Sequence, residues 1–338
     1  MDAKAAAQAL LRWYDRQRIA LPWRAPPGSP PPPAYRVWLA EVMLQQTTVA
    51  AVAPYYARFL ERWPTVEALA TAGDAEVMSA WAGLGYYARA RNLLACARAV
   101  VAEHGGDFPR TEADLRRLPG LGAYTAAAVA AIAWGERALV VDGNVERVAS
   151  RLLALPRPPA AERASILALL HAMAPDDRPG DFAQACMDLG RTICRPRAPD
   201  CLLCPVRPWC AAAALGTPDA FPVKTPRKAA PQRTGDCYLL TSQGDILLVD
   251  RPPKGLLGGM RGFPEVPPAA AAWRELGTVR HVFTHFGLTL TVHTAAGASR
   301  PPGLWWPVSR LDDAGLPTLF RRAAGLLTRE LAGTPAAA

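Results

Sequence analysis

The sequence predicts a mainly α-helical N-terminal region followed by a smaller α+β domain. Helix-like spacing of apolar residues recurs from residue 5 to residue 193, whereas residues 279–293 alternate as a strand does. Between them, residues 216–233 are rich in proline, small residues and Lys or Arg without periodicity, which is typical of a linker. A chain of 338 residues has room for two or three domains. We therefore expect domains at residues 1–215 and 234–338, joined by this linker.

The composition is that of a globular protein, with 51% apolar and 20% charged residues. The formal net charge of +9 favours polyanionic partners, nucleic acid first, although a solvated surface alone accounts for part of such an excess. No apolar run reaches the roughly 18 residues of a membrane span. The N-terminus also has charges where a signal peptide has its apolar core. We expect a cytoplasmic monomer with no membrane partner.

The first elements are two helices separated by a proline-rich loop. Residues 5–18 have a helical pattern that stops at Leu21-Pro22-Trp23-Arg24. Residues 25–33 form an extended loop, because proline fixes the backbone and removes hydrogen-bond donors. Residues 35–53 then read as a helix, with a break expected near Thr47.

This second helix places an acidic residue, Glu41, on a largely apolar face. Val37 and Trp38 lie one turn before it and Leu44 one turn after it. Glu41 is either an exposed acid at the edge of an apolar stripe or a general acid whose pKa burial raises toward neutrality. The residues alone leave the two interpretations about even.

Further helices are expected over residues 55–101, and the entry to one of them combines aromatic and basic residues. Gly83 and Gly85 permit a close backbone approach, and Tyr86-Tyr87 precedes several Arg residues. The segment is either a wedge that inserts into nucleic acid or a pair of core tyrosines beside a solvated basic face. Taken alone, core packing is the commoner case.

Residues 118–147 begin with a tight turn, Leu118-Pro119-Gly120-Leu121-Gly122. We expect both glycines to adopt backbone angles closed to other residues and to form an anion cradle with the N-terminus of a helix over residues 124–134. An apolar run then leads to Asp142-Gly143-Asn144, followed by a helix over residues 145–153. Asp142 is either a helix cap or a catalytic group, and capping is the commoner role of an acid at this position.

Two helices, over residues 161–173 and 181–193, lead into a cluster of cysteines at residues 194–210. The spacing is C-x6-C-x2-C-x5-C, and four thiolates so close in sequence can bind zinc or an iron–sulfur cluster. Without an export signal, a metal centre is favoured over disulfides. We expect the other three cysteines to be buried thiols without chemistry. The clustered cysteines are Cys194, Cys201, Cys204 and Cys210, and the others are Cys96, Cys186 and Cys237.

The combined motifs resemble those of the adenine glycosylases of the MutY type, a branch of the helix-hairpin-helix glycosylase superfamily. The matching segments are LPGLGAYTA with the later VDGN, EVMLQQT, GLGYYARARN and the cysteine spacing. The resemblance extends from about Leu21 to Leu327. It implies a helical region of two subdomains with an iron–sulfur cluster loop, followed by a Nudix-like α+β domain.

The resemblance also implies roles for individual residues. Glu41 would be the general acid and Asp142 the carboxylate that stabilises the sugar cation, with Tyr124 and Asn144 positioning them. The four clustered cysteines would hold a [4Fe–4S] cluster. Residues implied to contact DNA are Gly120 and Gly122 at the backbone, Gln46 and Tyr86 in the space left by the extruded base, and Arg24 and Gln184 at the adenine.

The C-terminal segment RPPKGLLGGMRGFPE resembles the Nudix-like domain of the same family. The resemblance implies that Thr284 and His285 contact 8-oxoguanine. Two departures are evident: Arg261 stands where the family commonly has an aromatic residue, and about ten residues separate Glu265 from Glu275, which leaves little room for the usual helix. No Nudix box is present, so we expect this domain to recognise a lesion and not to hydrolyse a pyrophosphate.

The function implied by the resemblance is monofunctional removal of adenine from double-stranded DNA that contains A:8-oxoguanine or A:G mispairs. The nearest alternative is a bifunctional lyase similar to endonuclease III, which needs an amine for a Schiff base. Tyr124 stands where the lyases have their lysine, and no lysine lies between Lys4 and Lys224. A second alternative is a non-catalytic iron–sulfur DNA-binding protein, which would bind DNA without releasing a base.

Overall fold

The computed structural model describes residues 1–26, 29–225, 230–252, 255–283, 285–297 and 299–333. The chain forms two compact units. The first comprises Met1–Ala70 with Ala95–Arg227, and the second Thr71–Leu94 with Lys228–Ala338. Their division near residue 227 falls inside the predicted linker, whereas nothing in the sequence indicated that residues 71–94 group with the C-terminal region.

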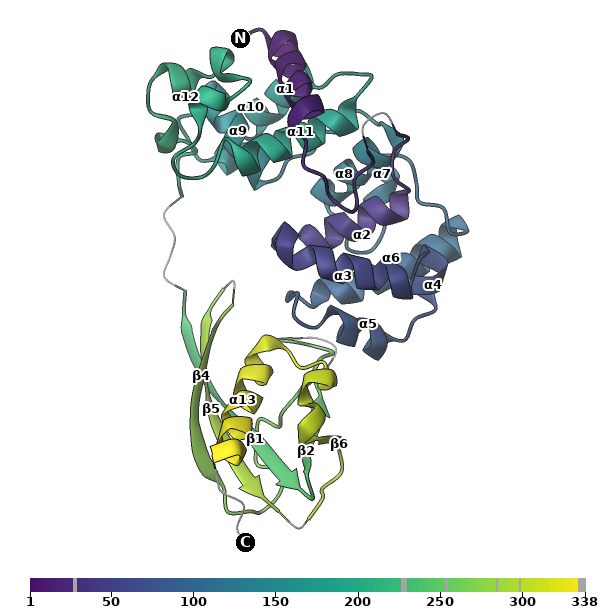
Figure 1. Cartoon of the computed structure of the whole chain (residues 1–338), viewed down its shortest axis with the longest axis vertical. Coiled ribbons are helices and arrows are strands. Elements are labelled where there is room, and N and C mark those ends of the chain that lie inside the picture. The colour runs from purple at the N-terminus through teal and green to yellow at the C-terminus, as the bar shows by residue number, and fades with distance from the viewer. Residues whose placement is uncertain (27–28, 226–229, 253–254, 284, 298, 334–338) are drawn as a thin grey trace. The chain divides into compact units, whose positions relative to one another are not determined.

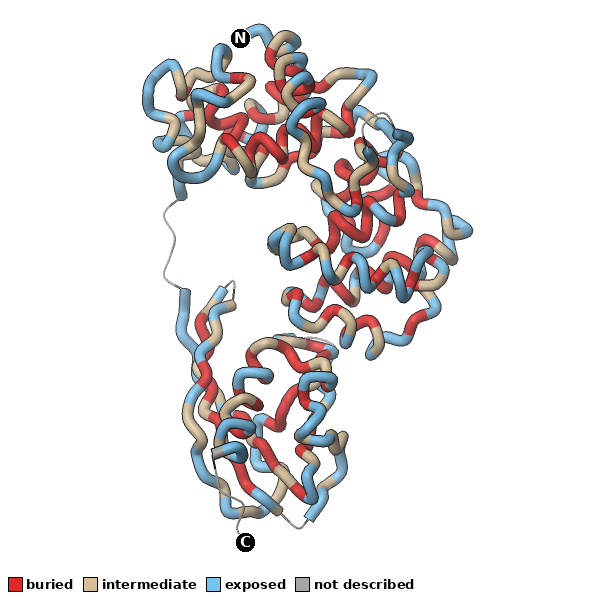
Figure 2. Tube along the Cα trace, in the orientation of Figure 1, coloured by how far each residue is buried: buried red, intermediate tan, exposed pale blue. Residues whose placement is uncertain are grey.

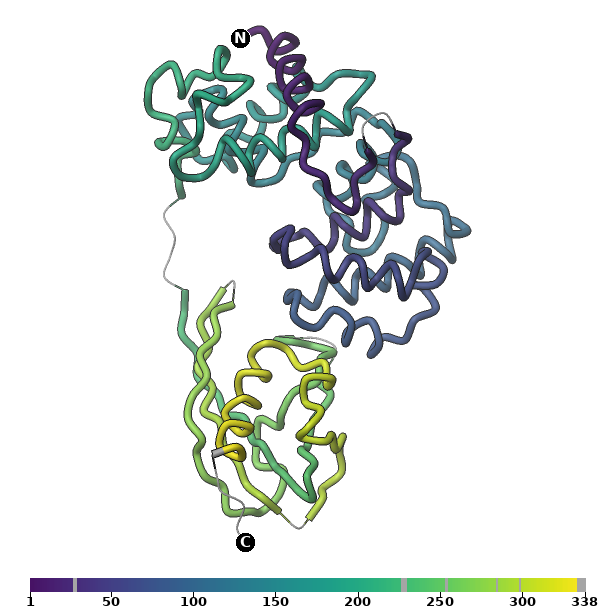
Figure 3. Tube along the Cα trace, in the orientation of Figure 1, coloured from purple at the N-terminus to yellow at the C-terminus, as the bar shows by residue number. Residues whose placement is uncertain are grey.

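The first unit is helical, as predicted, and its helices form two groups (Figure 1). Helix α8 packs against α2 and α7, and α9 packs against α10, α11 and α12. Helix α1, from the N-terminus, lies beside α10 and α11 from the middle of the chain (Figure 3). The bounds are α1 Ala3–Gln17, α2 Ala34–Leu44, α3 Val49–Arg62, α4 Val66–Ala70, α7 Glu112–Leu115, α8 Ala123–Trp134, α9 Gly143–Leu153, α10 Arg163–Met173, α11 Pro179–Thr192 and α12 Ala211–Ala214.

The break predicted near Thr47 is confirmed, because α2 ends at Leu44 and α3 begins at Val49. Thr48 caps α3 by accepting a hydrogen bond from the Ala51 N–H at 3.3 Å. Gln46, inside the break, has a left-handed backbone with φ +56°. The break therefore stops α2 shortly after Glu41 and leaves Gln46 in an exposed turn.

Helix α8 is the central element of the first unit. It is apolar around most of its circumference and buried from Thr125 to Ala131 (Figure 2), as expected for a core helix. It packs against both α2 and α11 and so connects the two helical groups. Gly135, with φ +70°, ends it in the left-handed conformation that favours glycine.

Two glycines of α11 allow close contacts with neighbouring elements. A Cβ at Gly180 would lie 2.5 Å from the Ala131 carbonyl oxygen of α8, and one at Gly190 would lie 2.6 Å from Asn144 Cβ of α9. Neither distance is compatible with a larger residue unless the backbone moves. These contacts fix α11 against α8 and α9 along the segment that carries several of the site residues.

The second unit combines α5 (Asp74–Trp81) and the first turns of α6 (Ala88–His104) with an α+β region. The described strands form a sheet of order β3-β2-β1-β5-β4, with β6 paired to β2. The β1–β5 pair is parallel and the other pairs are antiparallel. The bounds are β1 Gln232–Ser242, β2 Asp245–Asp250, β3 Arg261–Gly262, β4 Arg274–Val282, β5 Gly287–Ala296, β6 Leu304–Pro307 and α13 Thr318–Gly333.

The core of the α+β region lies between the sheet and α13, where Leu239 and Val292 pack with Phe320 in one cluster. A tight turn at Gln243 and Gly244, which both have positive φ, joins β1 to β2. The alternation predicted over residues 279–293 is divided between β4 and β5. A tight connection, in which the Phe283 N–H donates to the Phe286 carbonyl at 2.8 Å, reverses the chain between them. None of the described helices is both long and apolar enough to span a membrane.

Candidate active site

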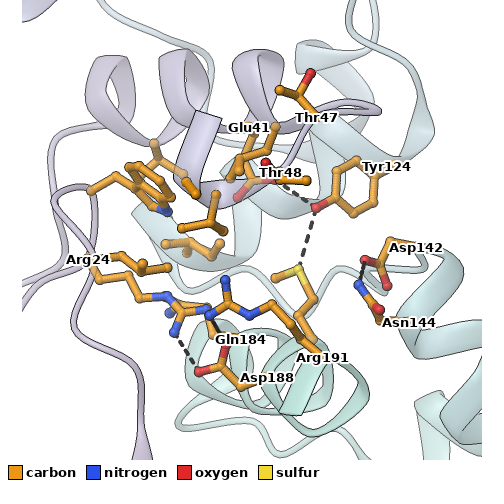
Figure 4. A pocket seen from close by; sticks show the side chains of 18 residues that line it. Arg24, Glu41, Thr47, Thr48, Tyr124, Asp142, Asn144, Gln184, Asp188 and Arg191 are labelled. Carbon is orange, nitrogen blue, oxygen red and sulfur yellow. Dashed lines mark hydrogen bonds and ion pairs between the residues drawn. The ribbon is translucent and has the colours of Figure 1, made fainter. Parts of the chain in front are cut away.

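A cavity of about 440 Å³ lies in the first unit, within the size range of small-molecule sites. It is lined from the loop before α2, from α2, α8 and α11, and from the start of α9. Figure 4 shows Tyr124 pointing toward Glu41, the Asp142 and Asn144 side chains together on another side, and the Arg24–Asp188 pair below them. The cavity brings together six residues predicted from the sequence: Arg24, Glu41, Tyr124, Asp142, Asn144 and Gln184.

Glu41 is buried on α2, with 5% of its surface exposed, so the interpretation as an exposed acid is wrong. The Tyr124 hydroxyl, from the first turn of α8, donates to Glu41 Oε2 at 2.7 Å. Burial raises the pKa of Glu41 from 4.5 to about 7, against the lowering effects of the Tyr124 hydrogen bond and of the Arg24 charge. This carboxyl group is therefore partly protonated at neutral pH.

Asp142 is a helix cap, the commoner of the two roles that the sequence left open. Its Oδ1 caps α9 by accepting the Val145 N–H at 2.7 Å, while Oδ2 accepts from Asn144 Nδ2 at 2.8 Å. The side chain also lines the cavity. The two donors and the helix N-terminus stabilise negative charge on Asp142. The helix cap is therefore also a wall residue of the cavity.

Arg147, on α9, holds Asn144 in place, and the sequence reasoning missed it. Its Nη2 donates to Asn144 Oδ1 at 2.8 Å and to the Gly190 carbonyl at 2.6 Å, and its Nε donates to the Cys194 carbonyl at 2.8 Å. The spacing of three residues between Asn144 and Arg147 on a helix was the available signal.

Two polar residues of α11, Gln184 and Asp188, face the same cavity. Gln184 is buried and donates to the Gly180 carbonyl at 3.2 Å. Asp188, one turn later, forms an ion pair with Arg24 at 2.6 Å. Asp188 was not identified from the sequence, although its position four residues after Gln184 places both on one face of the helix.

The predicted anion cradle before α8 is only partly as expected. Gly120 has φ +76°, a conformation that favours glycine. The prediction is wrong for Gly122, which has φ −79° and ψ 176° and is an extended N-cap. A Cβ at Gly122 would meet nothing within 4 Å, and no side chain caps this helix end. The α8 N-terminus is thus open to an approaching anion.

The two residues predicted to enter the duplex are both exposed, and both have a left-handed backbone conformation. Gln46 (φ +56°) is exposed in the first unit. In the second unit, Tyr86 has φ +49° and 48% exposure, with the Arg89 guanidinium 5.5 Å from its ring centre. Tyr87 is buried, so the core interpretation holds for Tyr87 and not for Tyr86. Left-handed conformations at non-glycine residues cost free energy and concentrate at functional sites.

The four clustered cysteines are partly exposed, free thiols. Three of them, with Trp209, pack against the core formed by α1 and α9–α11. Arg151, only 2% exposed, donates to Cys194 Sγ at 3.2 Å. Burial, and after it the charges of the other three cysteines, raise the pKa of Cys204 to about 12, so all four lie near one another. Within the described ranges, no group of three or more His, Cys, Asp or Glu converges closely enough to hold a metal ion.

The structure also gives the burial of the other three cysteines and the surroundings of the C-terminal residues singled out in the sequence. Cys96, Cys186 and Cys237 are buried, as predicted. Thr284 lies outside the described residues, and His285 is exposed. Arg261, on β3, lies 4.9 Å from the Trp306 ring centre, so a cation over an aromatic ring occupies the position where an aromatic residue was expected. No helix forms between Glu265 and Glu275.

Comparison with known families agrees with this fold and site. Residues 39–170 match the HhH-GPD superfamily of base excision DNA repair proteins, and residues 237–325 match the NUDIX domain. A solved thermostable thymine-DNA glycosylase has a TM-score of 0.57 and 27% identity, covering 63% of this chain and 97% of its own. The helical unit thus has the fold of a base-excision repair glycosylase.

Curated relatives define the family more narrowly. The adenine DNA glycosylase of Homo sapiens is 37% identical over 90% of this chain and 70% of its own length. That of Rattus norvegicus is 35% identical over 98% of this chain and 80% of its own. The chain belongs to the adenine DNA glycosylase family.

Proposed function

We propose that the protein is a monofunctional glycosylase that removes adenine mispaired with 8-oxoguanine or guanine in double-stranded DNA. One observation carries the proposal: a buried carboxyl group with a pKa of about 7 and a carboxylate held by two donors line the same cavity of about 440 Å³. Two carboxyl groups in such different environments suit an acid and a charge-stabilising role. The names of the relatives support adenine as the base.

Glu41 supplies the proton that the reaction needs. Adenine is a poor leaving group as an anion, so a ring nitrogen must gain a proton as the glycosidic bond breaks. The raised pKa of Glu41 keeps part of the enzyme in the protonated form at neutral pH. Tyr124, at 2.7 Å, holds the carboxyl group in one orientation, and burial raises the pKa of Tyr124, so it stays a neutral hydrogen-bond donor.

Asp142 stabilises the sugar as the base leaves. When the bonding electrons depart with the protonated adenine, positive charge develops at C1′ and the ring oxygen, and a nearby carboxylate lowers the energy of that state. Asn144 and the Val145 N–H fix both oxygens of Asp142. Water then adds at C1′ and loses a proton, which completes hydrolysis and leaves an abasic site.

None of the described residues that line the cavity has an amine that could form a Schiff base with the sugar. Tyr124 stands at the start of α8, and the chain has no lysine between Lys4 and Lys224. A lyase step through a lysine would need a residue from outside this stretch. This favours simple hydrolysis over strand cleavage.

The four clustered cysteines fit a [4Fe–4S] cluster in their donor type, since all are thiols, three pack against one core, and Cys194 and Cys210 both bond to the buried Arg151. When bound, the cluster would supply a structural crosslink. The loop of residues 194–210 also contains several Arg side chains, which it can present to phosphates. In the C-terminal region, His285 and Thr284 are the proposed contacts to 8-oxoguanine.

Single-turnover assays on duplexes with A:8-oxoguanine, A:G or thymine glycol test the proposal. We expect adenine release from the first two and no strand cleavage with the third. Glu41→Gln and Asp142→Asn should each reduce release at least 10³-fold, on the order expected for loss of such a group, while duplex affinity is retained. Glu61→Gln, an exposed change on α3, is the matched control and should behave as the parent.

Other outcomes would reject the proposal. Binding of the duplexes without base release by the parent would favour the non-catalytic DNA-binding protein. Cleavage of the thymine-glycol strand would favour the lyase. Normal turnover by either carboxyl variant would remove that residue from the mechanism.

A further inference from the structure

The Arg24–Asp188 ion pair is a buried charge pair at the wall of the cavity (Figure 4). Arg24 Nη1 donates to Asp188 Oδ2 at 2.6 Å and Arg24 Nη2 to Oδ1 at 3.0 Å, so the pair is bidentate. The side chains are only 9% and 2% exposed. The two residues lie 164 positions apart, on the loop before α2 and on α11.

Asp188 is also held by other groups. The Ile19 N–H donates to Oδ2 and Arg191 Nη2 donates to Oδ1, each at 3.4 Å. These contacts fix the carboxylate, which in turn fixes the plane of the Arg24 guanidinium. Arg24 therefore cannot turn away from the cavity without leaving a buried negative charge behind.

Stability alone is a weak explanation for such a pair. A buried ion pair loses hydration on both groups, and replacement by apolar residues is often neutral or stabilising. Asp188 and Arg24 line the same cavity as Glu41, and the Arg24 charge acts on the Glu41 carboxyl group. The position of the pair thus points to a role in the reaction.

We propose that Asp188 is a positioning residue that fixes the Arg24 guanidinium at the cavity wall and neutralises the charge that this guanidinium directs at Glu41. The inference rests on the proposed function, because it assigns a further residue to the same reaction. Asp188 itself does not touch the reacting atoms.

The ionisation of Glu41 depends on the charged and titratable groups that surround it and Arg24. Glu41 faces Tyr124 from α8, Asp142 from the start of α9 and Arg24 from the loop, and Arg24 in turn faces Tyr14 of α1 and Asp188 of α11. The remaining charged neighbours of Asp188 and Tyr14 are Arg191, Asp181 and Arg18.

An unpaired guanidinium would favour ionised Glu41 and remove the proton that the leaving base needs. It would also repel the positive charge that adenine gains on protonation. Asp188 cancels both effects while leaving the Arg24 N–H groups at the cavity wall.

The test is the pH dependence of single-turnover adenine release from an A:8-oxoguanine duplex by the full chain. In the parent, release should fall as pH rises through the pKa of Glu41, about 7. Asp188→Asn should move this fall to lower pH by about one unit, which is a tenfold loss of protonated enzyme above the transition. Asp188→Glu, which keeps the charge, should restore the parent position.

Two further variants separate charge from folding. Arg24→Gln leaves Asp188 with only the longer ion pair to Arg191 and should move the fall to higher pH, whereas Arg24→Gln with Asp188→Asn removes both charges of the pair and should return it to the parent position. The rate of the double variant at its optimum is not the readout, because Arg24 is also a proposed adenine contact.

If release falls at the same pH in Asp188→Asn as in the parent, the proposal is overturned, whatever the rate. If Asp188→Asn does not fold, a fall at the parent pH in Arg24→Gln would overturn it equally. A parent that binds the duplex but releases no adenine would reject both the proposed function and this inference. If the parent releases adenine and release falls at the same pH in every variant, only the inference is rejected.

Discussion

At the scale of single residues, Glu41 is the group on which the chemistry depends, because its surroundings favour the neutral acid. α2 carries it inward on a face of apolar residues, and burial outweighs the hydrogen bond from Tyr124 and the charge of Arg24. When Glu41 is ionised, the folded protein buries a negative charge, which lowers the free energy of unfolding. The same property therefore affects both activity and stability.

Glu41→Gln should make the helical unit more stable at high pH. The folded pKa of Glu41 is raised from 4.5 to about 7, so its contribution is fully present below pH 4.5 and is lost as pH rises through 7. That difference corresponds to roughly 3 kcal/mol, and Gln does not titrate. The variant and the parent should unfold at similar urea concentrations at pH 5, with the variant more stable at pH 8. The prediction is contradicted if the difference in urea midpoint between variant and parent is the same at pH 5 and pH 8. It is also contradicted if Glu61→Gln shows the same difference.

The sequence was sufficient to place Glu41 but not its partners. The period of a helix sets which residues share its face, so residues 37–44 place Glu41 on an apolar face but leave open whether that face is buried. Tyr124 lies 83 positions away and Asp188 lies 164 positions from Arg24, so these contacts depend on how helices pack. The family resemblance supplied Tyr124, whereas it was silent on Asp188 and Arg147. Residue type and spacing identify a candidate group, and only the packed structure gives its charge environment.

At the scale of secondary-structure elements, α11 positions the site through two close contacts. Gly180 lies against α8 and Gly190 against Asn144, so the helix that carries Gln184 and Asp188 is fixed at both ends of that segment. The Gly190 carbonyl also accepts from Arg147, which holds Asn144. The backbone of α11 thus supports the Asp142–Asn144 contact without touching the cavity itself.

Gly190→Ala should lower adenine release by displacing Asn144. The new Cβ would lie 2.6 Å from Asn144 Cβ, so one of the two backbones must move, at a cost of about 1–3 kcal/mol. We expect at least tenfold slower single turnover at a temperature where the variant is folded. Gly180→Ala is the matched control, since its Cβ would meet the Ala131 carbonyl at 2.5 Å and disturb α8. Equal loss of activity in both variants at equal stability would contradict a specific role for Asn144.

Elements with local signals were predicted well, and those that depend on contacts were not. The break before Thr48 and the cap at Asp142 follow from side chains that bond to nearby backbone. Gly122 is extended because it is the N-cap of α8, so its residue type reflects an open approach and not backbone strain. The alternation over residues 279–293 did not by itself separate two strands, although the apolar positions change from odd numbers at Phe283 to even numbers at Phe286, where the chain reverses.

At the scale of the whole molecule, the net charge of +9 is concentrated locally as well as spread over the surface. In the C-terminal region, the described residues that line a groove of about 600 Å³ between β4 and α13 include Arg280, Arg321, Arg322 and Arg329 and no acidic residue. Arg322 donates to the Arg280 carbonyl at 3.1 Å and so ties α13 to β4. Among the described residues, none of these four arginines forms an ion pair. Such a groove suits the phosphates of a duplex.

Arg321→Gln with Arg329→Gln should weaken duplex binding and reduce its salt dependence. Neither residue ties α13 to another element, because Arg321 bonds to Thr318 of its own helix and Arg329 lies against Gly325. Each lost phosphate contact lowers the slope of log affinity against log salt by about 0.9, so the slope should fall by up to about two. Fluorescence anisotropy over a salt series measures it. Arg310→Gln, which removes a charge paired with Asp313 outside the groove, should leave the slope at the parent value. An equal slope in the parent and the double variant would mean that the groove does not contact the duplex.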